Sequence, residues 1–167
     1  MSQLLNLFFD ICLFRKGPQD VPASSLLLGL SLVAYAVVGL LLLSTETTLP
    51  GALLQVAMEG GMLVGFIYVT LASADLKNRL LQTSIAMLGT DALISSLAIP
   101  ILFLSAGMHA VQNAHILLLM LMLWHVSVVA HILRHALSKS YGFGLGLAIV
   151  YFVGTVQLMT TIFGQPA

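Results

Sequence analysis

The stretch SSLLLGLSLVAYAVVGLLLLS, residues 24–44, decides the fold class, because it contains no charged side chain and is long enough to cross a bilayer. A helix rises about 1.5 Å per residue, so about 20 apolar residues cross a hydrocarbon core roughly 30 Å thick. Four further stretches of similar length are mostly apolar: residues 51–73, 82–106, 114–137 and 142–163. The sequence therefore predicts an all-α integral membrane protein, a bundle of five transmembrane helices.

The composition of the whole chain agrees with a lipid environment. Of 167 residues, 59% are hydrophobic and 7% are charged, whereas roughly a quarter of the residues of a soluble domain are charged. No segment alternates polar and apolar residues as a membrane β-barrel requires. The net charge is zero, which excludes the basic surface of a nucleic-acid-binding protein. The single cysteine, Cys12, excludes an internal disulfide and a cysteine-based zinc site.

Residues 1–23 precede the first span and are expected to stay on the mature protein. Arg15 and Lys16 follow the apolar stretch instead of preceding it, unlike the charge order of a signal peptide. Residues 1–14 show helical periodicity, with polar side chains on one side and apolar side chains on the other, and we expect a short helix in the membrane interface. The two sets are Gln3, Asn6 and Asp10, and Leu4, Leu5, Phe8 and Ile11.

Proline and serine residues predict where helices begin and bend. Pro18 and Pro22 frame a turn after the interfacial helix, and Ser24 or Ser25 can cap the first span. Pro50 fits the first turn of the second span. Pro100 lacks the N–H that would bond to the carbonyl of Ser96, so it should kink the third span. Residues 24–163 then form one bundle, followed by a short outer tail, 164–167.

The placement of basic residues predicts the orientation. All six lie before the first span, between the second and third, or around the connection between the fourth and fifth: Arg15, Lys16, Lys77, Arg79, Arg134 and Lys139. The other two connectors, 45–50 and 107–113, and the tail have none. Basic residues concentrate on the cytoplasmic side. We therefore expect a cytoplasmic N-terminus and an outer C-terminus, in a cell membrane such as the bacterial inner membrane.

Three ionisable residues are predicted to lie at similar depth near the bilayer midplane: Glu59, Asp91 and His125. Gln55 lies one helical turn before Glu59, and Ser95 one turn after Asp91, so both carboxylates share a face with a hydrogen-bonding side chain. Such residues usually point into the bundle. They serve either as hydrogen-bonding contacts between helices or as a pathway for protons or ions, because imidazole titrates near neutrality.

His131 and His135 lie four residues apart near the cytoplasmic end of the fourth span and so share a helix face. This spacing is compatible with two metal ligands. Their position beside Arg134 favours contact with lipid headgroups, and haem ligation by His125 would need a histidine from another chain. No cofactor is therefore predicted.

Two GxxxG patterns, Gly61 to Gly65 and Gly142 to Gly146, predict close helix packing within the bundle or between two copies. No nucleotide-binding loop, Ser-His-Asp arrangement or intramembrane protease motif is present, so the sequence predicts a protein that is not an enzyme.

Four segments of the second half form a particular series: Gly89-Thr90-Asp91-Ala92-Leu93, Ile99-Pro100, Leu123-Trp124-His125, and residues 131–140. This series resembles the closing spans of Yip1-type membrane proteins in their compact bacterial form. The resemblance covers the layout of residues 14–163. It implies five spans, a cytoplasmic N-terminus and an outer C-terminus. Eukaryotic members act in trafficking from the endoplasmic reticulum to the Golgi and contact small GTPases. The resemblance identifies no catalytic residue.

We therefore expect a non-enzymatic membrane protein that organises the bilayer or its protein partners, for example as a small subunit of a larger membrane complex. Its expected partners are the lipid bilayer and other membrane proteins or a second copy. A proton or ion pathway through Glu59, Asp91 and His125 is the alternative. A haem- or metal-binding membrane subunit is the second alternative.

Overall fold

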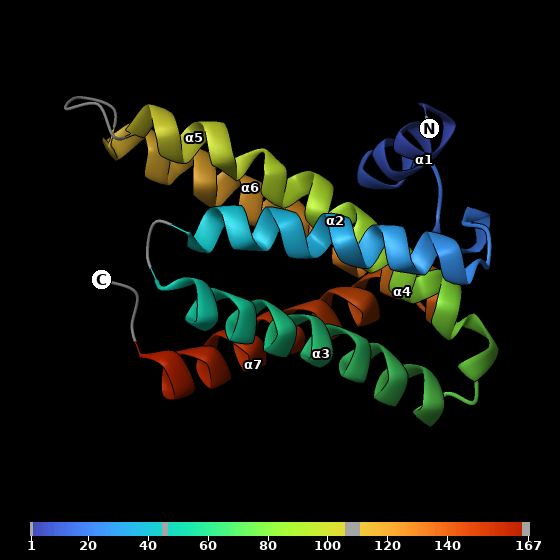
Figure 1. Cartoon of the computed structure of the whole chain (residues 1–167). Coiled ribbons are helices and arrows are strands. Elements are labelled where there is room, and N and C mark those ends of the chain that lie inside the picture. The colour runs from blue at the N-terminus through green and yellow to red at the C-terminus, as the bar shows by residue number, and fades with distance from the viewer. Residues whose placement is uncertain (1, 45–46, 106–110, 165–167) are drawn as a thin grey trace.

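The computed structural model describes residues 2–44, 47–105 and 111–164, and within these ranges the regular structure is helical, with no strand. Two short 3₁₀ helices lie in the connections: η1 between α1 and α2, and η2 between α3 and α4 (Figure 1). In chain order the elements are α1 (Ser2–Cys12), η1 (Pro18–Asp20), α2 (Ser25–Leu43), α3 (Leu49–Ser73), η2 (Lys77–Arg79), α4 (Leu80–Ser96), α5 (Ala98–Ser105), α6 (Val111–Leu137) and α7 (Tyr141–Phe163).

Five helical stretches of the described chain are long and apolar enough to cross a membrane: Ser25–Leu43, Leu49–Ser73, Lys77–Leu102, Ala114–Leu137 and Tyr141–Phe163. The predicted helical bundle with five long apolar helices is thus confirmed. Large apolar side chains such as Leu26, Val69 and Val150 remain exposed on the outside of the bundle, as expected where lipid is the solvent.

Helix limits follow local sequence signals. The Ser24 hydroxyl accepts a hydrogen bond from the Leu27 amide and caps α2, and Pro50 lies in the first turn of α3. The third apolar stretch is interrupted at Leu97, between α4 and α5, three residues before Pro100. The kink predicted from Pro100 is therefore present as a break in the helix.

Helix α4 is the centre of the bundle. It packs against α1, α2, α3 and α6, and every residue from Thr83 to Thr90 is buried (Figure 1). A helix that is buried on all sides has no outward face on which to place polar groups. Polar side chains of α4 must therefore find partners inside the protein or line a cavity.

Helix α1 packs onto α4 and α6 instead of lying apart from the bundle. Phe8 and Ile11 are buried, and the Phe8 ring faces Gly89 of α4. The predicted apolar face is wrong at Leu5, which is 57% exposed and forms an outward apolar stripe with Phe9 and Leu13. The reason is that α1 packs against α4 and α6, and the face of α1 that meets these two helices is the one that carries Phe8 and Cys12.

Two polar contacts hold the chain around the end of α1. The indole Nε1 of Trp124 donates to the carbonyl of Cys12 at 3.0 Å. Farther along, a ring nitrogen of His131 lies 2.9 Å from the carbonyl of Lys16. Both side chains belong to α6, so α6 holds both the end of α1 and the segment that follows it.

Among the described residues, the four glycines of the GxxxG patterns make no close helix contact, so the prediction that they pack within the bundle is wrong. A side-chain carbon added at Gly61, Gly65, Gly142 or Gly146 would meet nothing within 4 Å. Their neighbours make the close contacts instead: Gly60 faces the Tyr35 ring, and Gly144 faces the carbonyl of Ala130. One residue turns a helix by about 100°, so the patterned glycines point away from the bundle. Packing between two copies stays a prediction.

The segments that carry the six basic residues lie together at one end of the bundle, and the end of α2, the start of α3 and the end of α7 lie at the other (Figure 1). At the basic end, Arg79 joins η2 to the end of α6 by donating to the carbonyls of His135 and Ala136. Which end faces the cytoplasm stays a prediction.

The packing of α1 against α4 gives a test that uses the single cysteine. Burial raises the pKa of the Cys12 thiol to about 12, and only the thiolate reacts with alkylating reagents. Gly89→Ala should displace the Phe8 ring and weaken the packing of α1 against α4 by about 1–3 kcal/mol. The rate of Cys12 labelling should therefore rise roughly tenfold. Gly61→Ala, in open space, should leave the labelling rate unchanged. Equal labelling rates in the two variants would contradict the described packing of α1 against α4.

Candidate functional site

A polar cavity of about 250 Å³ lies between α2, α3, α4, α6 and α7. Its polar lining comes from all five of these helices: Tyr35, Glu59, Asp91, Ser95, His125, Tyr151 and Thr155. The remaining lining is apolar and includes Val38, Leu42 and Phe152. The structure therefore brings Glu59, Asp91, Ser95 and His125 to one place in the interior of the bundle.

The closest polar contact of the cavity joins α4 to α6. Nε2 of His125 lies 3.0 Å from Oδ1 of Asp91, and both side chains are mostly buried, with exposed fractions of 16% and 23%. The His125 ring also meets the Phe152 ring of α7 edge to face, with 5.2 Å between centroids. The imidazole is thus held between a carboxylate on one helix and an aromatic ring on another.

Glu59 lies on α3 and has a different environment. Its Oε1 accepts a hydrogen bond from Nε2 of Gln55 at 3.3 Å, one turn earlier on the same helix. In the described part of the chain, no hydrogen bond or ion pair joins Glu59 to another helix. The carboxyl group therefore faces the cavity supported only by its own helix.

Two tyrosines complete the polar lining, and sequence reasoning did not identify them. Tyr35 of α2 and Tyr151 of α7 lie close enough to Glu59 and Asp91 to interact electrostatically with both. The Tyr151 ring stacks at a tilt on Phe66 of α3, with 5.0 Å between centroids. A tyrosine within an otherwise apolar span was the available signal, because a buried phenol usually finds a polar partner.

His131 and His135 lie outside this cavity. His131 is 2% exposed, bonded to the carbonyl of Lys16 and in edge contact with the rings of Phe14 and His135. The interpretation that His131 contacts lipid headgroups is therefore wrong, because the N-terminal segment covers it. Within the described residues, no group of three or more His, Cys, Asp or Glu side chains could hold a metal ion. His115 is exposed, and His109 lies outside the described residues.

The cavity can bind or exchange protons. Carboxylate, imidazole and phenol groups all accept a proton or donate one, and five helices contribute them to this one cavity. The carboxylate and phenol groups also carry oxygen atoms, the ligand type of small hard cations. Hydrolytic chemistry would need a nucleophile activated by a neighbouring base. The lining contains the hydroxyl of Ser95, and in the described residues no hydrogen bond joins this hydroxyl to a base.

A double-mutant cycle tests the contact between Asp91 and His125. The variants Asp91→Ala and His125→Ala should show a coupling of about 0.6–2 kcal/mol in the free energy of unfolding, as for hydrogen bonds between membrane helices. Unfolding can be followed by circular dichroism in mixed micelles. In the described residues the Ser127 hydroxyl donates to the Leu123 carbonyl of its own helix and has no bond to another helix, so Ser127→Ala should show no coupling to Asp91→Ala. A coupling no larger than in this control pair would disprove the contact.

Comparison of this chain with protein-family models, with curated proteins and with solved structures gives no match. The resemblance to Yip1-type membrane proteins therefore stays a prediction.

Proposed function

We propose that this chain is a non-enzymatic integral membrane protein that passes protons or a small cation through its polar cavity. The observation that carries the proposal is the position of Glu59. It lines the same cavity as the pair of Asp91 and His125, and in the described residues its hydrogen bond goes to its own helix.

Structural hydrogen bonding between helices accounts for Asp91 and His125 but not for Glu59. The contact from Asp91 to His125 joins α4 to α6 and stabilises their packing. A carboxyl group that serves this purpose needs a partner on another helix, and the described contacts of Glu59 do not include one. An ionisable side chain is costly at this depth, so a group kept there without a structural partner favours a functional role.

The chemistry around Glu59 supports proton exchange. An isolated carboxylate is unfavourable in a low-dielectric interior, and binding a proton or a cation removes that cost. The hydroxyl groups of Tyr35 and Tyr151 both donate and accept hydrogen bonds and line the same cavity. A proton on Glu59 therefore has other proton-binding groups in the same cavity toward which it can move, including His125.

Proton flux in proteoliposomes tests this function. Wild-type protein should dissipate an imposed pH gradient. Glu59→Gln should lower the rate of dissipation by about tenfold or more, because an amide side chain does not bind and release a proton near neutral pH. Asp75→Asn is the matched control: the same chemical change in an exposed connector, at a position with a positive φ that asparagine tolerates. Folded wild-type protein without proton flux or cation flux would refute the proposal.

A second candidate function is assembly with other membrane proteins or with a second copy. The observation that favours it is the outward direction of Gly61 and Gly65 on α3 and of Gly142 and Gly146 on α7. Outward glycines let another helix approach closely in a bilayer, where association depends on packing. A Yip1-type organiser of the membrane fits this candidate. We propose the bacterial inner membrane, with the basic end in the cytoplasm, as the location for both functions.

Leucine substitutions separate the second candidate from the first. Gly61→Leu with Gly65→Leu should remove cross-linked dimers or co-purifying membrane proteins, because the side chains block close approach. Gly29→Leu is the control, since Gly29 of α2 also has open space around it and lies outside the GxxxG patterns. Wild-type protein that is monomeric in mild detergent and brings down no partner would contradict this candidate.

A further inference from the structure

A second hollow, which we call the basic pocket, lies at the end of the bundle that carries all six basic residues. It has a volume of about 320 Å³ and lies between η1, the start of α4 and the end of α6. The side chains that matter for its chemistry are those of Gln19, Arg79, Gln82, Thr83, His135 and Ser138. They are separate from the residues of the polar cavity.

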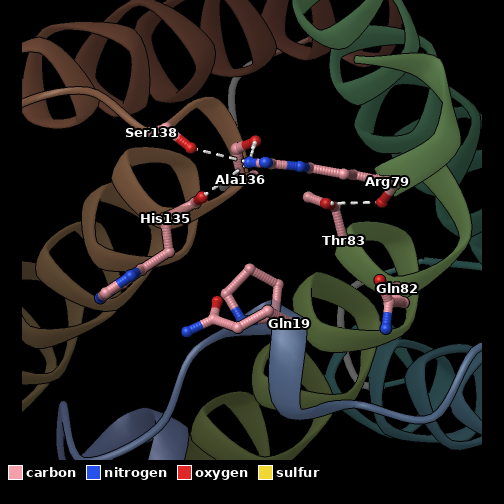
Figure 2. Close-up of a pocket in the computed structure, with 8 residues that line it drawn as sticks. Gln19, Arg79, Gln82, Thr83, His135, Ala136 and Ser138 are labelled. Atoms are coloured by element: carbon pink, nitrogen blue, oxygen red, sulfur yellow. Dashed lines mark hydrogen bonds between the residues drawn. The ribbon is translucent and has the colours of Figure 1, made fainter.

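Arg79 fixes a positive charge in the basic pocket. Figure 2 shows its side chain crossing from the start of α4 to the end of α6. Nη1 donates to the carbonyls of His135 and Ala136, at 3.3 and 2.8 Å, and to the Ser138 hydroxyl at 2.9 Å. A cation is favourable beside the last carbonyls of a helix. The guanidinium is therefore held in one orientation before any ligand arrives.

The same bonds leave part of the guanidinium available. Five N–H groups belong to each arginine side chain, and the described bonds of Arg79 all use Nη1. Within the described residues, no hydrogen bond uses Nε or Nη2. A phosphate oxygen is the acceptor that a planar guanidinium recognises best.

Neighbouring side chains supply further donors. The Ser138 hydroxyl accepts from Arg79 and keeps its own proton to donate, and no hydrogen bond of the described chain uses the His135 ring. The Gln82 amide donates one N–H to the Val21 carbonyl, at 2.8 Å, and keeps a second N–H, whereas Thr83 already donates its hydroxyl proton to the Arg79 carbonyl. In Figure 2, Gln19 lies between His135 and Gln82, at the η1 wall of the pocket.

The charge around the basic pocket favours an anion. Six basic residues share this end of the bundle with three acidic ones, Asp10, Asp20 and Asp75. Asp10 is paired with Arg15 and Lys16, and Asp20 accepts a hydrogen bond from the Gly17 amide. None of the three acids lines the pocket. The end as a whole is therefore positive, and Arg79 is its fixed charge inside the hollow.

We propose that the basic pocket binds the phosphate group of an anionic phospholipid headgroup. The end of the transmembrane helices is the depth of lipid phosphates, and basic pockets between helices on the cytoplasmic side suit anionic headgroups. The volume of about 320 Å³ is at the small end of the range of ligand sites and is sufficient for a phosphate with a small polar headgroup. This inference is independent of proton movement through the polar cavity.

The choice of variant decides whether the test is clear. Arg79→Gln removes three bonds to the end of α6 and can impair folding by itself. Gln19→Glu instead adds a negative charge at the pocket wall and breaks no described hydrogen bond. Lys139→Gln is its matched control, because it also lowers the net charge by one at the same end, on an exposed side chain outside the pocket.

The experiment titrates the full chain in detergent with dioctanoyl phosphatidylglycerol and follows the unfolding temperature with a thiol-reactive dye that reports on Cys12. A ligand that binds only the folded state raises this temperature, and the rise grows with the logarithm of the ratio of free ligand to its Kd. Wild-type protein and Lys139→Gln should respond at similar lipid concentrations. Gln19→Glu should need about tenfold more lipid, because an added like charge faces the phosphate at short range.

Three outcomes would overturn the proposal. The first is an equal rise of the unfolding temperature with dioctanoyl phosphatidylcholine, which carries a compensating cation. The second is equal loss of the response in Gln19→Glu and Lys139→Gln, which would indicate general charge attraction. In the third, inorganic phosphate alone gives the full response with the same sensitivity to Gln19→Glu, and the ligand is then a free anion instead of a lipid.

Discussion

The contact of 3.0 Å between Asp91 and His125 is the interaction on which the interior of the bundle depends. Helix α4 is surrounded by other helices, so a carboxylate on it cannot reach water at the surface. The imidazole on α6 gives that carboxylate a partner and fixes the relative position of the two helices. The cavity forms where α2, α3 and α7 close around this pair.

Residue depth was predictable from the sequence, because a helix advances by a constant rise per residue. Counting from the ends of the apolar stretches placed Glu59, Asp91 and His125 at one level, and the structure places them around one cavity. Helix starts at Ser24 and Pro50 and the break before Pro100 were also predictable, since they depend on local hydrogen bonding. Each of these features is set along a single helix.

Rotation about the helix axis was less predictable, because it depends on which neighbour a helix meets. The GxxxG patterns selected Gly61 and Gly142, whereas Gly60 and Gly144 make the contacts. The same limitation applies to Leu5 of α1 and to His131, whose exposure depends on the N-terminal segment that lies over α6. Tyr35 and Tyr151 were missed for a related reason: their helices are apolar on every side, so periodicity did not distinguish an inner face.

The two neighbouring residues Trp124 and His125 show how the bundle uses both sides of α6. Adjacent residues on a helix point about 100° apart. Trp124 therefore turns outward to bond to the end of α1, while His125 turns inward to Asp91. Helix α4 repeats this division, with Gly89 receiving the Phe8 ring of α1 and Asp91 facing the cavity two residues later. The packing site of α1 and the polar cavity are thus built from different sides of the same two helices, so the position of α1 and the contact between Asp91 and His125 both depend on how α4 packs against α6.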